Sequence, residues 1–304
     1  MSDLINPYYY GVRLRNWLYD RKVLKVCKLC VPVVSVGNLS LGGSGKSSLV
    51  RHIANLLPEL HVCLLSRGYR RSSKGTLLVS SRGHVLRGWQ EAGDEPYMLA
   101  KVLRHASVVV DEDRCRGAQF ALKSLKPDLF ILDDGFQHRR MARDLDILLL
   151  RKRDFSDRLL PFGRLREPLS SLERADLLVL SYGELESFDW QHPSKPTLKM
   201  VREGWKVIRT SDLRELDNFR ELEFTAFAGL GDNRQFFLTL ERLGIKTVRR
   251  LSFPDHYHYR DFILRKDQLY ITTMKDAVKL PPTDNLYYLD FDLRVEGLKE
   301  FLRF

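Results

Sequence analysis

The first stretch of chemical interest is a glycine-rich turn that ends in a lysine and a serine. It follows the apolar run 31–36. Glycines let a backbone curl so that its N–H groups point at an anion, and a helix start adds the positive end of its dipole. Lys46 suits the β- and γ-phosphates of a nucleotide, and the Ser47 hydroxyl suits Mg²⁺. The usual pattern has Gly at position 40, but the turn still predicts a nucleotide site formed by Ser40, Leu41, Gly42, Gly43, Ser44, Gly45, Lys46 and Ser47.

A pair of carboxylates ends a second apolar run. Asp133 and Asp134 follow residues 129–132, and Gln137 and His138 come shortly after them. A carboxylate at the end of a strand beside a phosphate loop can hold Mg²⁺ directly or through water. Gln137 and His138 would either point into the same crevice or begin the next helix. The pattern predicts a metal site of Ser47, Asp133 and Asp134, and leaves open which carboxylate is the ligand.

Two further stretches offer acid–base groups. Asp94 and Glu95 precede Pro96, where they would either cap the next helix or provide the general base that a phosphoryl-acceptor hydroxyl needs. His256 and His258 lie two residues apart, which fits either a metal pair or a single imidazole that orients a carboxylate.

Arginines follow several of the apolar runs. Guanidinium groups bind phosphates in a bidentate manner, so two to four of these side chains are expected to touch ligand. The candidates are Arg67, Arg70, Arg71, Arg114, Arg116, Arg139, Arg140, Arg164 and Arg166.

The elements that must position these residues alternate between strands and helices. Such alternation predicts an α/β fold, a phosphate-loop-containing and mostly parallel sheet flanked by helices, with ligands at the carboxyl ends of the strands. Expected strands are 31–36, 61–66, 106–110, 128–132, 145–150 and 177–180, and expected helices are 47–57, 95–105 and 114–124.

The pattern weakens between residues 183 and 223 and then resumes. Strands are expected at 224–228, 247–251 and 269–273, with a helix at 234–243. This predicts a phosphate-loop domain at 31–183, a strand-rich linker at 184–223 and a smaller C-terminal α/β domain at 224–304.

Composition indicates a globular, basic protein. The chain has 304 residues, 44% hydrophobic and 29% charged, with a net charge of +11. Basic proteins attract polyanions or anionic membrane faces. Four cysteines are too few for a disulfide scaffold. Cys27 and Cys30 form a C-x-x-C that could be redox-active or half a zinc site, but no second pair at zinc-like spacing follows, so reduced thiols are expected.

The N-terminal segment, residues 1–30, mixes aromatic and basic residues. Tyr8, Tyr10, Leu14 and Trp17 lie among arginines and lysines. This composition fits equally a basic amphipathic helix lying in a membrane interface and a first helix packed on the domain with a solvated basic face.

Taken in order, the motifs resemble the tetraacyldisaccharide 4'-kinase family of lipid A biosynthesis, over nearly the whole chain. They are V-G-N-L-S-L-G-G-S-G-K-S (36–47), S-R-G-Y (66–69), G-D-E-P (93–96), D-E-D-R (111–114), D-D-G-F-Q-H (133–138), R-D-L-D-I (143–147), L-P-F-G-R-L-R-E-P (160–168), F-A-G-L-G (227–231), F-P-D-H (253–256) and T-M-K-D-A-V-K-L (273–280). Members of the family have Ser or Thr at the position of Ser40.

The resemblance implies phosphoryl transfer from ATP-Mg²⁺ to the 4'-hydroxyl of a tetraacylated glucosamine disaccharide 1-phosphate, at the cytoplasmic face of the bacterial inner membrane. It implies that Asp94 is the catalytic base, His256 its partner from the C-terminal domain, and Lys46 a contact of the transferred phosphate. It implies an N-terminal membrane-associating helix. Contacts to substrate, phosphate or metal are implied for Asn38, Tyr69, Glu95, Arg114, Gln137, Arg166 and Glu167.

The expected partners are therefore the lipid disaccharide and the anionic inner-membrane surface, with neither nucleic acid nor an obligate protein partner. The alternative is a membrane-associated nucleotide switch, a GTPase or ATPase. Thr273-Met-Lys-Asp276 has the wrong spacing for a guanine-reading motif, which disfavours a GTPase.

Overall fold

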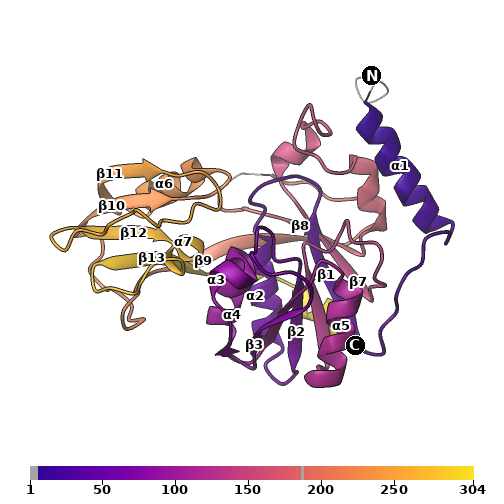
Figure 1. The fold of residues 1–304 in the computed structure, drawn as a ribbon. Coiled ribbons are helices and arrows are strands. Elements are labelled where there is room, and N and C mark those ends of the chain that lie inside the picture. The colour runs from indigo at the N-terminus through magenta and orange to yellow at the C-terminus, as the bar shows by residue number, and fades with distance from the viewer. Residues whose placement is uncertain (1–5, 186–187) are drawn as a thin grey trace. The chain divides into compact units, whose positions relative to one another are not determined.

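The computed structural model describes residues 6–185 and 188–304 (Figure 1). The chain forms two compact units: unit 1 comprises Met1–Val201 and Leu293–Phe304, and unit 2 comprises Arg202–Asp292. We expected the whole of 224–304 to form the smaller domain. The structure instead returns the C-terminal residues to unit 1, because Val295, Leu298 and Leu302 are buried in its core.

Unit 1 contains a mostly parallel sheet in the order β9-β8-β7-β1-β6-β2-β5-β3-β4. The parallel strands are β1 (Val33–Asn38), β2 (Val62–Ser66), β5 (Ser107–Val110), β6 (Leu129–Asp133), β7 (Leu145–Leu150), β8 (Leu177–Leu180) and the start of β9 (Thr197–Arg209). The α/β architecture expected from the sequence is thereby confirmed.

The helices of unit 1 connect these strands. They are α1 (Pro7–Asp20), α2 (Lys46–Leu56), α3 (Trp89–Ala92), α4 (Asp94–Val102) and α5 (Arg114–Ser124), with the 3-10 helices η2 (Lys152–Phe155), η3 (Leu169–Arg174) and η4 (Leu298–Leu302). None of the helices in the described part of the chain is both long and apolar enough to cross a membrane.

The strands of unit 1 are apolar on both faces, because helices or loops cover each side. In β1, Val34 and Val36 belong to one core cluster and Val33 to another. Strand β6 alternates in the same way, with Ile131 on the first face and Phe130 on the second. Runs of apolar residues rather than alternation are therefore the correct signature for this parallel sheet.

Sequence patterns missed the short antiparallel edge of the sheet. Strand β3 (Leu77–Ser81) pairs antiparallel with β5 and with β4 (His84–Val85). The β3–β4 turn uses Arg82 and Gly83, both with positive φ, at 44° and 82°. Two of the five residues of β3 are serines and β4 has only two residues, so neither has the apolar run that identified the buried strands.

The strands of unit 2 lie in the order β11-β10-β12-β13 and pair in parallel. Its elements are β10 (Glu223–Ala228), α6 (Asn233–Arg242), β11 (Lys246–Ser252), β12 (Leu269–Thr273), α7 (Met274–Ala277) and β13 (Leu286–Val295). Its core combines Phe224, Phe236 and Leu240 with other buried side chains. Strand β13 was not expected, because its alternating Leu286–Val295 pattern is half polar.

One covalent feature corrects the sequence analysis. Cys27 and Cys115 form a disulfide with their Cα atoms 6.4 Å apart, so the expectation of reduced thiols was wrong for these two. Cys30 is a free, exposed thiol, and the C-x-x-C is therefore not a pair. The backbone of Cys27 bonds to Arg140 and Ala142, which holds the segment after α1 against the loop between β6 and β7, and local spacing carried no sign of this contact.

We expect Cys27→Ser to lower the free energy of unfolding by about 2–4 kcal/mol and Tm by about 10 °C. The bond joins residues 88 apart in the chain, so it removes much conformational freedom from the unfolded state. Calorimetry without reductant measures the loss. Cys30→Ser is the matched control and should leave Tm unchanged; an equal fall in both variants, or in neither, would contradict the prediction.

Candidate active site

The glycine-rich turn lies between β1 and α2 and is shaped to receive an anion. Gly42 and Gly45 have φ values of 95° and 86°, which side-chain-bearing residues rarely adopt. Gly45 caps α2 without any side-chain hydrogen bond. The hydroxyls of Ser40 and Ser44 are buried and have no hydrogen-bond partner among the described residues. The turn therefore holds uncommitted donors at the start of a helix, as an anion site requires.

Cations converge beside this turn. Lys46 Nζ donates to Asn38 Oδ1 at 3.0 Å and lies 3.5 Å from Asp134 Oδ1. Arg166 donates from both terminal nitrogens to the Asp134 carboxylate, at 2.8 and 2.7 Å, and also to Asn38 Oδ1 at 2.6 Å. Gln137 Nε2 donates to the Asn38 carbonyl at 3.0 Å. Five residues expected at the site thus form one network.

The pKa values of the adjacent carboxylates Asp133 and Asp134 are shifted in opposite directions. Burial raises the pKa of Asp134, but Lys46 and Arg166 outweigh it and hold that pKa well below its usual range. Burial, followed by the charges of Glu95 and Asp134, raises the pKa of Asp133 to about 7. Asp134 is therefore held ionised by cations, whereas the positive charge of Lys46 does not offset the burial of Asp133.

The donors around Asp133 fit Mg²⁺. Asp133 Oδ1 is buried with no hydrogen-bond partner among the described residues, while Oδ2 accepts from Ser66 at 3.2 Å. Ser47 Oγ donates to Glu95 Oε2 at 3.0 Å, and the charge of Glu95 in turn raises the pKa of Asp133. Within residues 6–185 and 188–304 no group of three or more His, Cys, Asp or Glu could hold a metal alone. Carboxylate and hydroxyl oxygens of this kind are the donors that Mg²⁺ prefers.

We expect Asp133→Asn to stabilise the ligand-free protein by about 2 kcal/mol, or ~5 °C in Tm, at about pH 8. The raised pKa means that the folded carboxyl keeps its proton where the unfolded one has lost it, so this group makes stability fall as pH rises from about 4 to about 7. The gain should disappear at about pH 5, as calorimetry at both pH values would show.

Asp134→Asn is the matched control and should lower Tm at neutral pH. Its depressed pKa means that the charged form stabilises the fold above the usual carboxyl pKa, through Lys46 and Arg166. Burial, with Arg114 and Arg143, lowers the pKa of His138 to about 4. This histidine makes stability rise between about pH 4 and 6.5, opposite to the effect of Asp133, so the variants must be compared with each other at each pH. Destabilisation by Asp133→Asn at about pH 8 would contradict the raised pKa of Asp133.

Asp94 and Glu95 begin α4. Asp94 is buried, and the preceding Gly93 caps the helix with a φ of 91° and no side-chain cap. A Cβ at Gly93 would lie 3.1 Å from the Tyr69 carbonyl oxygen, so Gly93 permits the turn to pass close to this backbone. The structure thus places Asp94 next to Glu95, whose carboxylate reaches Ser47 of the phosphate loop.

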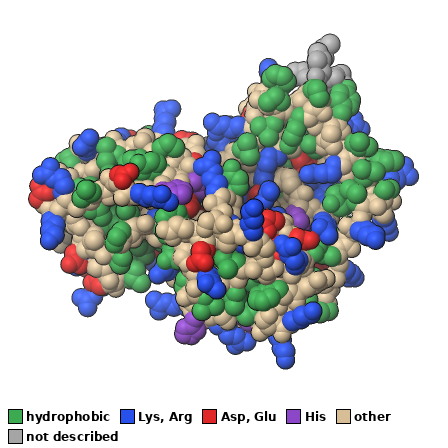
Figure 2. All heavy atoms as spheres, viewed as in Figure 1, with side chains coloured by type: hydrophobic (Ala, Val, Ile, Leu, Met, Phe, Trp, Pro, Cys, Tyr) green, Lys and Arg blue, Asp and Glu red, His purple; other side chains and the backbone are tan. Residues whose placement is uncertain are grey.

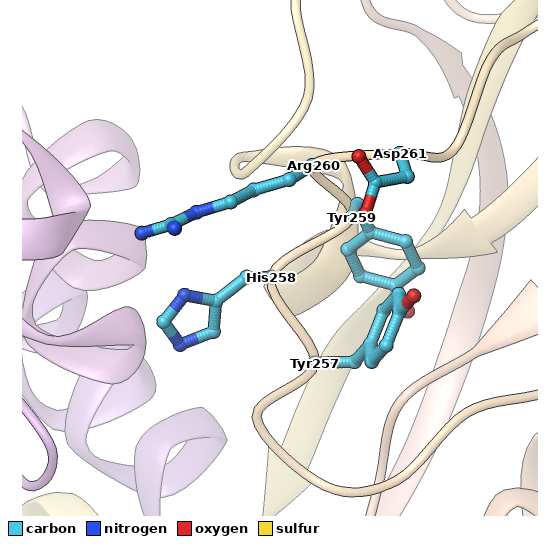
Figure 3. Close-up of a pocket in the computed structure, with 5 residues that line it drawn as sticks. All are labelled: Tyr257, His258, Tyr259, Arg260 and Asp261. Carbon is cyan, nitrogen blue, oxygen red and sulfur yellow. The ribbon is translucent and has the colours of Figure 1, made fainter.

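His256 lies in unit 2, in the loop after β11. Its φ is 64°, and its Nε2 lies 3.7 Å from Asp255 Oδ2. Asp255 also forms an ion pair with Lys275, at 2.9 Å. The next five residues line a pocket of about 330 Å³: Tyr257, His258, Tyr259, Arg260 and Asp261. In Figure 3, His258 and Arg260 point the same way, while the two tyrosine rings lie beside each other, 5.1 Å apart. The pairing of His256 with Asp94 stays a prediction.

Three other expected residues lie outside the central network. Tyr69 is exposed beside Arg70. Arg114 is buried, and this burial lowers the pKa of its guanidinium although the negative charges of Asp134 and Asp133 act to raise that pKa. Glu167 is fully buried, and its carboxylate accepts from Arg15, Asn16 and Arg174. Glu167 therefore connects the site segment to α1 and is not directed at the phosphate loop.

Three residues near the site were not singled out from the sequence. Arg151 and the hydroxyl of Tyr182 both donate to the carbonyl of Gly43, at 3.3 and 3.2 Å. They follow the carboxyl ends of β7 and β8, so the strand-end rule that found Asp133 applies to them also. Arg143 donates to the carbonyls of Gly135 and Phe136 and thereby fixes the loop after Asp134.

A glycine-rich turn with Lys46 at a helix start, next to a strand that ends at Asp133 and is followed by Asp134, defines a phosphate-loop nucleotide-binding protein. The sequence profile described as tetraacyldisaccharide-1-P 4'-kinase matches residues 4–303. The chain belongs to this family.

Individual curated proteins and a solved structure of the same family are also similar to this chain. A tetraacyldisaccharide 4'-kinase of Aquifex aeolicus is 54% identical over 287 residues, 94% of this chain and 90% of that protein. One of Syntrophus aciditrophicus is 35% identical over 335 residues, covering 97% and 88%. A crystal structure of LpxK from Aquifex aeolicus in complex with ATP matches with a TM-score of 0.90 and 52% identity, covering 97% of this chain and 95% of that one. The nucleotide-switch alternative is not favoured.

Proposed function

We propose that this member of the family transfers the γ-phosphate of ATP to the 4'-hydroxyl of a tetraacyldisaccharide 1-phosphate, at the cytoplasmic face of the inner membrane. The observation that carries the proposal is the network in which Asn38 and Asp134 hold Lys46 and Arg166 beside the phosphate loop. Phosphoryl transfer depends mainly on alignment and charge neutralisation, and fixed cations provide both.

Each residue has a separate task in this reaction. The N–H groups of Gly42 to Ser47 bind phosphate oxygens, while Lys46 and Arg166 neutralise the charge that develops on the transferred group. Asp94 accepts the proton of the acceptor hydroxyl as that oxygen attacks phosphorus. Gln137 and Arg143 keep the loop after Asp134 in place.

Mg²⁺ would be held by Asp133 and Ser47, with Glu95 adjoining, and it would supply further neutralisation of the nucleotide phosphates. The uncommitted Asp133 Oδ1 and its raised pKa support this role for Asp133 rather than Asp134. Asp134 instead orients Lys46 and Arg166.

Helix α1 supports docking on an anionic membrane. Tyr10, Leu14 and Trp17 are exposed at helical spacing on one face, while Val12 is buried on the opposite face. Figure 2 shows apolar and basic side chains interspersed over this helix. Aromatic and basic residues together suit the headgroup layer. Residues 1–5 of the predicted membrane segment lie outside the described part.

We expect the double variant Leu14→Ser, Trp17→Ser to bind anionic vesicles at least ~30-fold more weakly than wild type, because two large apolar side chains no longer enter the lipid. Vesicle sedimentation measures this. Leu86→Ser, at an exposed apolar residue near the β4 edge, is the control. Unchanged binding of the double variant would mean that α1 is not the docking element.

The reaction is tested by incubation with ATP-Mg²⁺ and a tetraacyldisaccharide 1-phosphate. The expected product carries a second phosphate at the 4' position, identified by mass spectrometry and ³¹P NMR. ATP hydrolysis without a phosphorylated lipid, stimulated by membranes or another protein, would contradict the proposal and support a nucleotide switch.

A further inference from the structure

A second apolar projection lies next to α1, in the turn between β7 and β8. This turn, Leu160-Pro-Phe-Gly163, presents Phe162, whose side chain is 71% exposed. Phe162 is the most exposed aromatic residue in the described part of the chain. An aromatic ring gains free energy when it leaves water, so a ring held in solvent needs an explanation.

The turn is rigid rather than a loose loop. Leu160 N–H donates to the Leu165 carbonyl and Leu165 N–H to the Arg158 carbonyl, each at 2.9 Å. Phe162 and Gly163 both donate to the carbonyl of Leu159. These bonds fix the backbone on both sides of Phe162, so its ring is presented to solvent by a hydrogen-bonded turn.

The turn is joined directly to α1. Asn6 Nδ2 donates to the Leu160 carbonyl at 2.8 Å, and the Tyr8 hydroxyl donates to the Arg166 carbonyl at 2.9 Å. Figure 1 shows α1 beside the segment that follows β7. These bonds attach the start of α1 to the segment that carries Phe162.

Charge beside the ring fits an anionic lipid layer. Arg158 and Arg164 flank Phe162 in the sequence, and both are exposed. The two nearest acids in the sequence are both engaged: Asp157 accepts from the backbone N–H groups of Arg158 and Arg164, at 2.8 and 3.2 Å, and Glu167 is buried and paired with Arg15 and Arg174. An apolar ring between cations is the chemistry that inserts among acyl chains below anionic headgroups.

We propose that the Leu160–Gly163 turn is a second membrane-inserting element, with Phe162 entering the acyl layer of an anionic bilayer beside α1. This rests on the membrane docking in the proposed function. The same segment bonds to the phosphate loop, through Leu41 N–H to the Arg164 carbonyl at 2.8 Å and Arg166 N–H to the Leu39 carbonyl at 2.6 Å. Two insertion points, one of them tied to the phosphate loop, would set the depth and tilt of the active site relative to lipid-embedded acceptor.

The experiment uses Phe162→Ser in the full-length protein, with vesicles of phosphatidylethanolamine containing a minority of phosphatidylglycerol. Phe162→Ser should bind the vesicles about tenfold more weakly than wild type, and the loss should persist at high salt because it is apolar. Leu86→Ser, at an equally surface-located apolar residue, should bind as wild type does. Tm and ATP affinity without lipid should be unchanged in both variants.

The outcomes separate this inference from the function on which it rests. Wild-type vesicle binding by Phe162→Ser, while Leu14→Ser, Trp17→Ser has lost it, overturns the role of the turn and leaves docking by α1 intact. Absence of binding by wild type overturns both. If Phe162→Ser binds vesicles as wild type does but has a raised KM for acceptor in detergent micelles, insertion of Phe162 into the bilayer is overturned. Phe162 would then contact the acyl chains of the acceptor instead.

Discussion

Asp94→Asn should lower kcat for lipid phosphorylation by about 10³-fold while ATP affinity changes less than about threefold. The substitution keeps the size of the side chain and removes its ability to accept a proton. Asp94 is buried at the start of α4, next to Glu95, which reaches the phosphate loop. Steady-state kinetics and equilibrium ATP binding on the same preparation measure the two quantities.

The alternative for Asp94 is a purely structural role at a helix start, and Asp113 provides the matched control. Asp113 caps α5, with its carboxylate accepting from the N–H groups of Cys115 and Arg116. Asp113→Asn should cost about 1 kcal/mol or less of stability and leave kcat near wild type. If Asp94→Asn behaves like Asp113→Asn, the general-base assignment fails.

Lys46→Ala should reduce kcat/KM for ATP by about 10²–10⁴-fold, because it removes the cation that the phosphate loop directs at the transferred group. The loss should appear in kcat more than in KM, since the charge on that group develops fully only during transfer. Initial rates over a range of ATP-Mg²⁺ concentrations separate the two parameters.

Lys123→Ala is the control for lost positive charge, because Lys123 is an exposed residue in the last turn of α5. It should leave kcat/KM unchanged. Lys46→Ala also leaves Asp134 with one cation fewer, so its Tm should be measured together with the kinetics. A normal kcat/KM for ATP in Lys46→Ala would contradict the assignment of the loop.

The core of the fold was predictable because buried parallel strands carry long apolar runs. The turn after β1 and the aspartates after β6 were predictable as neighbours, because consecutive motifs at the carboxyl ends of a parallel sheet meet at one edge. The same rule would have added Arg151 and Tyr182, which reach Gly43 from the ends of β7 and β8.

Other features depend on contacts that no local pattern encodes. The different states of Asp133 and Asp134 follow from the position of Arg166, which comes from a segment 32 residues away in sequence. The Cys27–Cys115 bond and the return of residues 293–304 to unit 1 are likewise consequences of tertiary packing. The roles implied for His256 and Tyr69 stay predictions.

The buried carboxylate of Glu167 has a practical consequence for anyone who shortens this chain. Arg15 and Asn16 of α1 provide two of its partners, so cutting away the helix would leave Arg174 as its remaining described partner and lower the free energy of unfolding by about 1–3 kcal/mol. Removing α1 to improve solubility would therefore remove exposed apolar side chains but also lower the stability of the fold. Keeping the helix and making only its outward side polar preserves the internal ion pairs.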